Sequence, residues 1–148
     1  AIAGAFAKGQ PIVTYYWTPT SLMGKPEIDM VRLKEPAYDK ACWDSMMVVV
    51  DNIKIYGTNA YESSCASEYK DMALTKLTTG SFYNSNPEII SFAKAYTITT
   101  SVVNNLLAYY VDISDRNLEE TAKYYLKNYS EWEAWVPSDV RSKIKNTL

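Results

Sequence analysis

Three consecutive aromatic residues, Tyr15, Tyr16 and Trp17, stand directly before a Thr-Pro-Thr turn in the stretch TYYWTPTSLMGK. The composition of PIVTYYW is typical of a β-strand, so we expect a strand over residues 12–17 that leads into the turn. Successive side chains of a strand point to opposite faces, and only alternate rings can reach one core. Rings at the end of a strand can instead stack on a sugar or face a quaternary ammonium ion, which ring quadrupoles attract. A structural role and a ligand-binding role both remain open from the chemistry alone.

The carboxylates of the chain favour structural roles over catalytic ones. An acid and base pair of the glycosidase kind needs two carboxylates near strand ends in an aromatic cleft, and only Glu27, Asp29 and Glu35 come near such a position. Carboxylates in loops are more commonly solvated, which makes this pair the less favoured interpretation. Others fall in the first turns of expected helices, where the helix dipole stabilises negative charge. These are Glu119, Glu120, Glu131, Glu133 and Asp139.

Histidine is absent from the sequence. Its absence removes the commonest general base, the histidine-activated serine and cysteine nucleophiles, and most transition-metal sites. The two cysteines, Cys42 and Cys65, cannot form a zinc site by themselves, so they are either two buried free thiols or one disulfide. An even number of cysteines favours the disulfide. We therefore expect no enzymatic activity, no catalytic residues, no metal and no cofactor.

Length and composition predict one globular domain over residues 1–148. Hydrophobic residues make up 47% and charged residues 22% of the 148 residues, and no apolar run is long enough to cross a bilayer. The formal net charge of −2 and the lack of lysine and arginine clusters argue against a nucleic-acid partner.

Local signals predict a mostly helical second half. Asn86 before Pro87 is typical of a helix start, Thr99 is a candidate cap for the next helix, and Asn117 with Glu120 has the spacing of a capping box. A short helix carrying Trp132 and Trp135 on one face, both expected to be mostly buried, and a polar final helix after Pro137 close the chain.

The first half is less regular in its signals. The opening AIAGAFAK is typical of the end of an amphipathic helix that Gly9 and Pro11 stop, and it lacks the features of a signal peptide. Residues 30–34 are expected to form a second short strand that Pro36 closes. Residues 46–57 fit either a strand or a buried helix, and their periodicity does not decide between the two.

Four segments of the chain carry a family resemblance. They are KGQPIVTYYWTPTSLMGK, VRLKEPAYDKACW, NPEIISFAKAYTITTSVVNNLLAYY and EWEAWVPSDV. In this order they resemble the C-terminal half of the glycine betaine and proline betaine binding proteins of ABC importers, and YYWTPT is the most specific part. The resemblance implies an α/β fold, namely a portion of the two-lobe type 2 periplasmic-binding-protein fold, of which this chain is the helix-rich C-terminal part.

The same resemblance implies an aromatic cage around a trimethylammonium group. Trp17 matches a cage tryptophan of the family's Trp-Thr-Pro segment, with Tyr16 and Tyr15 as its neighbours. Tyr96 lies slightly out of register with a further aromatic residue that some members carry. Some members also have a second tryptophan where this chain has residues 21–22, Ser and Leu. This departure leaves the ligand open among glycine betaine, choline, carnitine and proline betaine.

The implied partners are a small quaternary amine, the transmembrane permease of an ABC importer and the missing N-terminal half of the receptor. The implied location is extracytoplasmic, either in the periplasm or lipid-anchored at the outer face of the cytoplasmic membrane, which agrees with a Cys42–Cys65 disulfide. The alternative is a secreted aromatic-rich carbohydrate-binding domain, in which the same rings would stack on sugars. Competition by tetraalkylammonium ions distinguishes the two, because a sugar platform does not attract a permanent cation.

Overall fold

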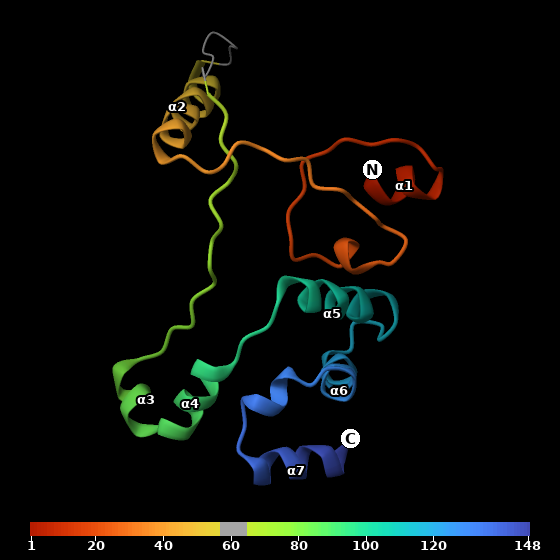
Figure 1. Ribbon diagram of the computed structural model, residues 1–148, viewed down its shortest axis with the longest axis vertical. Helices are drawn as coiled ribbons and strands as arrows, with labels where there is room; N and C mark the ends of the chain where they lie inside the picture. The colour runs from red at the N-terminus through yellow and green to blue at the C-terminus, as the bar shows by residue number, and fades with distance from the viewer. Residues whose placement is uncertain (57–64) are drawn as a thin grey trace. The chain divides into compact units, whose positions relative to one another are not determined.

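A computed structural model describes residues 1–56 and 65–148 of the chain (Figure 1). The residues group into two compact units, each with its own internal packing. The larger unit comprises Ala1–Met30 and Lys76–Leu148, and the smaller unit comprises Val31–Thr75. We describe each unit by itself.

The larger unit consists of short helices joined by irregular segments (Figure 1). In chain order its helices are α1 (Ile2–Ala7), η1 (Leu22–Gly24), α3 (Gly80–Ser85), α4 (Pro87–Ala95), α5 (Thr100–Asp112), α6 (Leu118–Asn128), η2 (Glu131–Ala134) and α7 (Ser138–Thr147), where η denotes a 3-10 helix. The predicted stop after the first helix is confirmed, since α1 ends before Gly9, which has a positive φ of 62°. The short helix and the final helix predicted near the C-terminus are confirmed as η2 and α7.

Side-chain caps begin two of these helices as the sequence predicts. The Thr99 hydroxyl accepts a hydrogen bond of 3.3 Å from the amide of Val102 at the start of α5. The side-chain oxygen Oδ1 of Asn117 accepts one of 3.1 Å from the amide of Glu120 at the start of α6. Pro87 opens α4 as expected, but the Asn86 side chain donates to the carbonyl of Phe82 in α3 instead of capping α4. The predicted helix starts are therefore confirmed, and the role of the Asn86 side chain differs.

The core of the larger unit is assembled from residues far apart in the sequence. Its buried residues are Ile2, Ile28, Ile90, Ala108, Ser114, Tyr125 and Trp132. The Trp132 side chain is 3% exposed, and its indole Nε1 donates to the carbonyl of Leu126 at 3.0 Å. Trp135 is only half-buried, so the prediction of mostly buried side chains is confirmed for Trp132 and met in part for Trp135.

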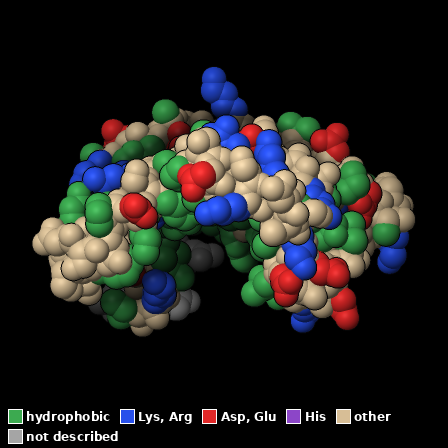
Figure 2. Space-filling model, turned by 90° about the horizontal axis from the view of Figure 1, so that it is seen from below, with side chains coloured by type: hydrophobic (Ala, Val, Ile, Leu, Met, Phe, Trp, Pro, Cys, Tyr) green, Lys and Arg blue, Asp and Glu red, His purple; other side chains and the backbone are tan. Residues whose placement is uncertain are grey.

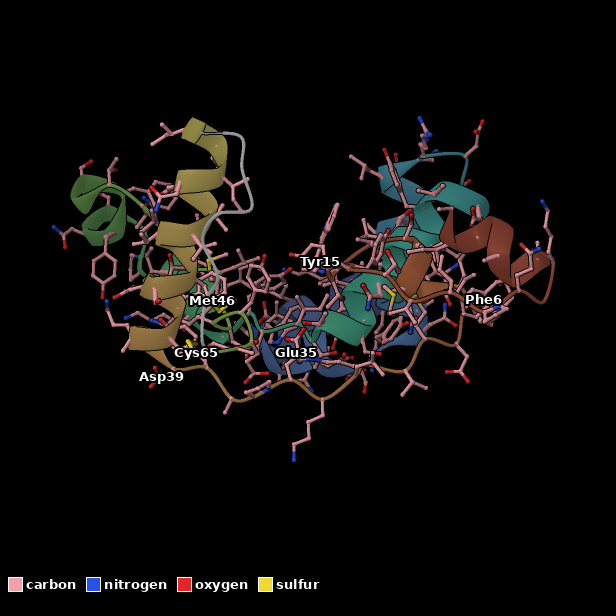
Figure 3. The ribbon with its side chains drawn as sticks, turned by 90° about the horizontal axis from the view of Figure 1, so that it is seen from above. Phe6, Tyr15, Glu35, Asp39, Met46 and Cys65 are labelled. Atoms are coloured by element: carbon pink, nitrogen blue, oxygen red, sulfur yellow. A yellow bond between two sulfur atoms is a disulfide. The ribbon has the colours of Figure 1, made fainter. Side chains whose placement is uncertain are left out.

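The smaller unit is organised around α2 (Lys40–Tyr56). The Asp39 carboxylate caps this helix by accepting a hydrogen bond of 2.7 Å from the amide of Cys42. A disulfide joins Cys42 to Cys65, with Cα atoms 5.9 Å apart, and it lies beside the helix near Met46 (Figure 3). The amide of Asp39 donates to the hydroxyl of Ser67 at 3.0 Å. The start of α2 is thus fixed to the segment that follows Cys65.

Both strand predictions are wrong for this structure. The described residues contain no strand, and residues 12–17 and 30–34 are irregular. A strand persists only when its amides and carbonyls pair with a neighbouring strand, and β composition alone does not supply that neighbour. Residues 46–56 lie in α2, so the helical alternative is the correct one. The helix is not buried as expected, because Val48 is 60% and Ile55 is 69% exposed. The helix-rich character is confirmed, and the expected sheet is not seen among the described residues.

Candidate ligand-binding site

The ring cluster, which we define as Tyr15, Tyr16 and Trp17, comes together in the larger unit. The rings of Tyr16 and Trp17 stack with centroids 5.2 Å apart and planes at 21°. The rings of Tyr15 and Trp17 are tilted at 43° with centroids 6.5 Å apart. Neighbouring residues would point to opposite faces of a strand, so the stacking of Tyr16 on Trp17 follows from the irregular backbone of this segment.

Two of the three rings are largely exposed. Trp17 is 63% and Tyr15 is 64% exposed, whereas Tyr16 is half-buried. A ring that served only to fill the core would lose most of its accessible surface. The ring cluster therefore presents an aromatic surface, which can attract a cation through ring quadrupoles or stack on an apolar face of a ligand.

Asn104 of α5 holds the turn that follows the ring cluster. Its side-chain oxygen Oδ1 accepts a hydrogen bond of 2.8 Å from the amide of Thr20. The same oxygen accepts a second one of 3.1 Å from the hydroxyl of Thr18. The Thr20 hydroxyl in turn accepts a hydrogen bond of 3.4 Å from the amide of Met23 at the start of η1. These bonds tie the chain immediately after Trp17 to α5.

The far end of the same turn packs on the backbone of α5. An ideal Cβ placed on Gly24 would lie 2.0 Å from the carbonyl oxygen of Asn104, so only glycine fits at this approach. One residue further, the Lys25 ammonium forms an ion pair of 2.6 Å with the carboxylate of Asp112 at the end of α5. The hydrogen bond to that carboxylate raises the pKa of Lys25 above its ordinary value.

Tyr96 lies in a different set of rings, the C-terminal aromatic group. This group comprises Phe92, Tyr96, Tyr125, Tyr129 and Trp135. The Tyr96 ring meets Trp135 edge-on with centroids 4.7 Å apart. The Lys76 ammonium lies 5.1 Å from the centroid of the Tyr96 ring and donates hydrogen bonds to the carbonyls of Ala93 and Tyr96. The structure thus brings Tyr15, Tyr16 and Trp17 together. The ring of Tyr96 lies apart from them in sequence and faces the ammonium of Lys76.

A groove of about 470 Å³ lies between η1, α5 and α6. One side carries Tyr109 and Tyr124, whose rings stack with centroids 3.9 Å apart. The ion pair of Lys25 and Asp112 lines the same groove together with Glu27. The lysine and the aspartate are paired with each other and offer little free charge to a ligand, while the Glu27 carboxylate adds one further negative charge to the groove.

The carboxylates considered for catalysis fall in both units. Glu27 and Asp29 belong to the larger unit and are exposed, and Glu35 belongs to the smaller unit, where it lines a second open groove of about 340 Å³. Within the ranges 1–56 and 65–148 no group of three acidic or metal-ligating side chains is placed to hold a metal ion. In the same ranges no helix is both long and apolar enough to cross a membrane. On the face drawn in Figure 2, lysine and arginine side chains are interspersed with acidic ones.

Sequence reasoning missed the residues that position the ring cluster. Asn104 and Gly24 contact each other across 80 positions of the chain, and no local rule links them. A weak signal was present in SVVNNLL, because asparagine is a poor residue for a helix interior and its side chain can hydrogen-bond backbone groups.

Comparison with known proteins agrees with the resemblance seen in the sequence. No curated protein and no solved structure gives a significant match to the chain. Residues 1–128, most of the chain, match the family described as the substrate binding domain of the ABC-type glycine betaine transport system. The matched range includes the ring cluster, the anchoring residue Asn104 and both cysteines. The chain therefore belongs to the family of substrate-binding domains of ABC-type glycine betaine transport systems.

Proposed function

We propose that the protein is the extracytoplasmic substrate-binding component of an ABC importer and that it binds glycine betaine or a related quaternary ammonium compound through the ring cluster. The observation that carries the proposal is the exposed indole of Trp17, 63% accessible, with Tyr16 stacked beside it. The family to which the chain belongs supports the class of ligand. In this role the protein binds a solute for import and performs no covalent chemistry.

Binding follows from the chemistry of a trimethylammonium group. Its methyl groups offer no N–H donor, so the positive charge is held by the negative faces of aromatic rings. Each ring contributes on the order of 0.5 to 2 kcal/mol, with the larger values reached when water is excluded. The half-buried Tyr16 supports the indole of Trp17 from one side, and the exposed surface of Trp17 faces the ligand in this proposal, with Tyr15 beside it.

The ring cluster supplies one wall of the proposed cage. We assign the remaining rings and the donors for the ligand carboxylate to the other half of a two-lobe receptor, which closes on the ligand and excludes water. The loaded receptor would then dock on a transmembrane permease. A location outside the cytoplasm is compatible with the Cys42–Cys65 disulfide, which forms in oxidising compartments.

Tyr96 is not included in the proposed cage. Its ring already faces the Lys76 ammonium at 5.1 Å and packs on Trp135, so a ligand cation would have to displace a tethered one. Among quaternary amines the proposal leaves glycine betaine, choline, carnitine and proline betaine as candidates. The ring cluster recognises the ammonium group that all four share.

Calorimetric titration of the two-lobe receptor with glycine betaine tests the proposal. We expect saturable binding that tetramethylammonium weakens by competition and that a neutral monosaccharide leaves unchanged. The 148 residues alone are expected to bind weakly, because one wall cannot surround a cation. Binding of the sugar without binding of betaine would contradict the proposal and favour a carbohydrate-binding module.

A further inference from the structure

We propose that Asn104 is a positioning residue for ligand binding, because it holds the ring cluster in the arrangement that receives the ligand. This inference rests on the proposed function. Asn104 does not belong to the ring cluster, and it follows Trp17 by 87 positions in the sequence. It acts through two hydrogen bonds that its side-chain oxygen accepts from Thr18 and Thr20, the residues that flank Pro19.

The side-chain atom that faces the turn must be an oxygen. The amide of Thr20 can only donate a hydrogen bond, and it lies 2.8 Å from the side chain of Asn104. Both Thr20 and Asn104 are half-buried, so loss of this acceptor would leave the amide without its partner in a partly desolvated place. The role thus requires an acceptor at position 104, and a carboxylate can supply it as an amide does.

The backbone of the same residue limits the other end of the turn. The carbonyl oxygen of Asn104 occupies the place where a Cβ on Gly24 would lie. Residues 18–24 are therefore held at one end by the Asn104 side chain and at the other by its main chain. Because Trp17 immediately precedes this stretch, its backbone is fixed on that side.

Backbone control matters for Trp17 because its indole packs on the rings of the neighbouring residues Tyr16 and Tyr15 and remains largely exposed. With 63% of the residue exposed, contacts with a core do not determine where the ring points. A mobile ring must be ordered when the ligand binds, and that ordering reduces affinity. Asn104 is expected to lower this cost by holding the ring before the ligand arrives.

The test compares three variants of the two-lobe receptor. Asn104→Leu removes the acceptor at similar size, Asn104→Asp keeps an acceptor, and Asn105→Leu is the matched control on the same helix. Asn105 is exposed, and its side-chain amide donates a hydrogen bond of 3.5 Å to the hydroxyl of Tyr129 and not to residues 18–20. Affinity for glycine betaine is measured by calorimetry at a temperature where thermal unfolding shows every variant to be folded.

We expect Asn104→Leu to raise the dissociation constant about tenfold, since it loses two hydrogen bonds that order the binding surface. Asn104→Asp should stay within about threefold of wild type, because it retains the acceptor. Asn105→Leu should bind like wild type. A folded Asn104→Leu receptor with wild-type affinity would overturn the inference, as would equal losses in all three variants.

A second measurement separates this inference from the proposed function. The indole ¹⁵N relaxation of Trp17, assigned by the signal lost in Trp17→Phe, reports ring mobility without any ligand. Increased mobility of the Trp17 ring in Asn104→Leu, with unchanged mobility in Asn105→Leu, would support the anchoring. Failure of the wild-type receptor to bind betaine would contradict only the proposed function and would leave this conclusion standing. Unchanged Trp17 relaxation in Asn104→Leu would overturn the anchoring whatever the ligand.

Discussion

The phenol ring of Tyr16 stacks on the indole of Trp17 with centroids 5.2 Å apart, although the two residues are adjacent in the sequence. Tyr16 is half-buried and Trp17 is exposed, so one ring attaches the pair to the larger unit and the other faces solvent. This relationship makes Trp17 the first residue to test, because its ring can be changed with little effect on the core.

Replacement of Trp17 should change ligand affinity in a graded order. In the two-lobe receptor, Trp17→Ala should weaken glycine betaine binding by about 1 to 2 kcal/mol, and Trp17→Phe should retain part of the affinity because a weaker quadrupole remains. Calorimetric titration measures the order Trp, Phe, Ala. Thermal unfolding is the control, since an exposed ring should leave the melting temperature nearly unchanged. Unchanged affinity in a folded Trp17→Ala receptor would contradict the cage.

A methyl group at position 24 should destabilise the larger unit. Gly24→Ala would place a Cβ 2.0 Å from the carbonyl oxygen of Asn104, and relief of that clash should cost about 2 to 3 kcal/mol of unfolding free energy. Gly4→Ala in α1 is the matched control, because no atom lies within 4 Å of its Cβ. The control should be neutral or stabilising by up to about 1 kcal/mol. Urea unfolding measures both, and equal stabilities would contradict the close packing of η1 on α5.

Truncation of the two tryptophans of the last third of the chain should have unequal effects. Trp132→Ala should cost about 3 to 5 kcal/mol, because the side chain is 3% exposed and donates a hydrogen bond to the carbonyl of Leu126. Trp135→Ala should cost less, since that ring is half-buried. Denaturant unfolding compares the two variants. A folded Trp135→Ala receptor that lost betaine affinity would instead place Trp135 in the binding site.

The hydroxyl of Tyr125 should give the protein a distinctive alkaline titration. Burial, with a smaller contribution from the Glu131 carboxylate, raises the pKa of Tyr125 from 10.0 to about 12. The unfolded chain therefore releases this proton at lower pH than the folded protein does, and stability falls as the pH rises from 10 to about 12. Unfolding free energy measured across this window should fall less steeply in Tyr125→Phe than in wild type.

The same substitution tests the energetics of that hydroxyl near neutral pH. Among the described residues the Tyr125 oxygen has no hydrogen-bond partner, so its removal should be neutral or stabilising by about 1 kcal/mol. A clear loss of stability in Tyr125→Phe at pH 7 would show that the hydroxyl has a partner in solution.

Reduction of the Cys42–Cys65 bond should loosen the smaller unit. The bond links residues separated by 23 positions, and a loop of this length is worth about 3 kcal/mol of unfolding free energy. Alkylation of the denatured, unreduced protein should label no thiol, and labelling after reduction should modify two. Two labelled thiols without reduction would contradict the bond in the protein as isolated.

Local chemistry in the sequence determined the helix starts. Thr99 and Asn117 accept hydrogen bonds from amides three residues later, and Pro87 begins a helix at a position where its missing N–H costs nothing. Each of these signals acts within one turn, so sequence suffices to find it. The four resembling segments, of which YYWTPT is the most specific, likewise predicted the family that the match over residues 1–128 shows.

Pairing and burial were decided only by the tertiary structure. Residues 12–17 have the composition of a strand, but a strand also needs a partner at its edge, which composition does not encode. The apolar run within α2 could not be assigned by periodicity, and the helix is fixed at its start by Asp39 and by the disulfide to Cys65.

The candidate site shows the same division. The sequence determined that three rings lie next to one another before a Thr-Pro-Thr turn, because covalent order places them there. The tertiary structure decided that Tyr16 and Trp17 stack, that Lys76 faces the Tyr96 ring, and that Asn104 binds the amide of Thr20. Such contacts join residues separated by as many as 84 positions, and they depend on how the helices pack rather than on any preference of the residues themselves.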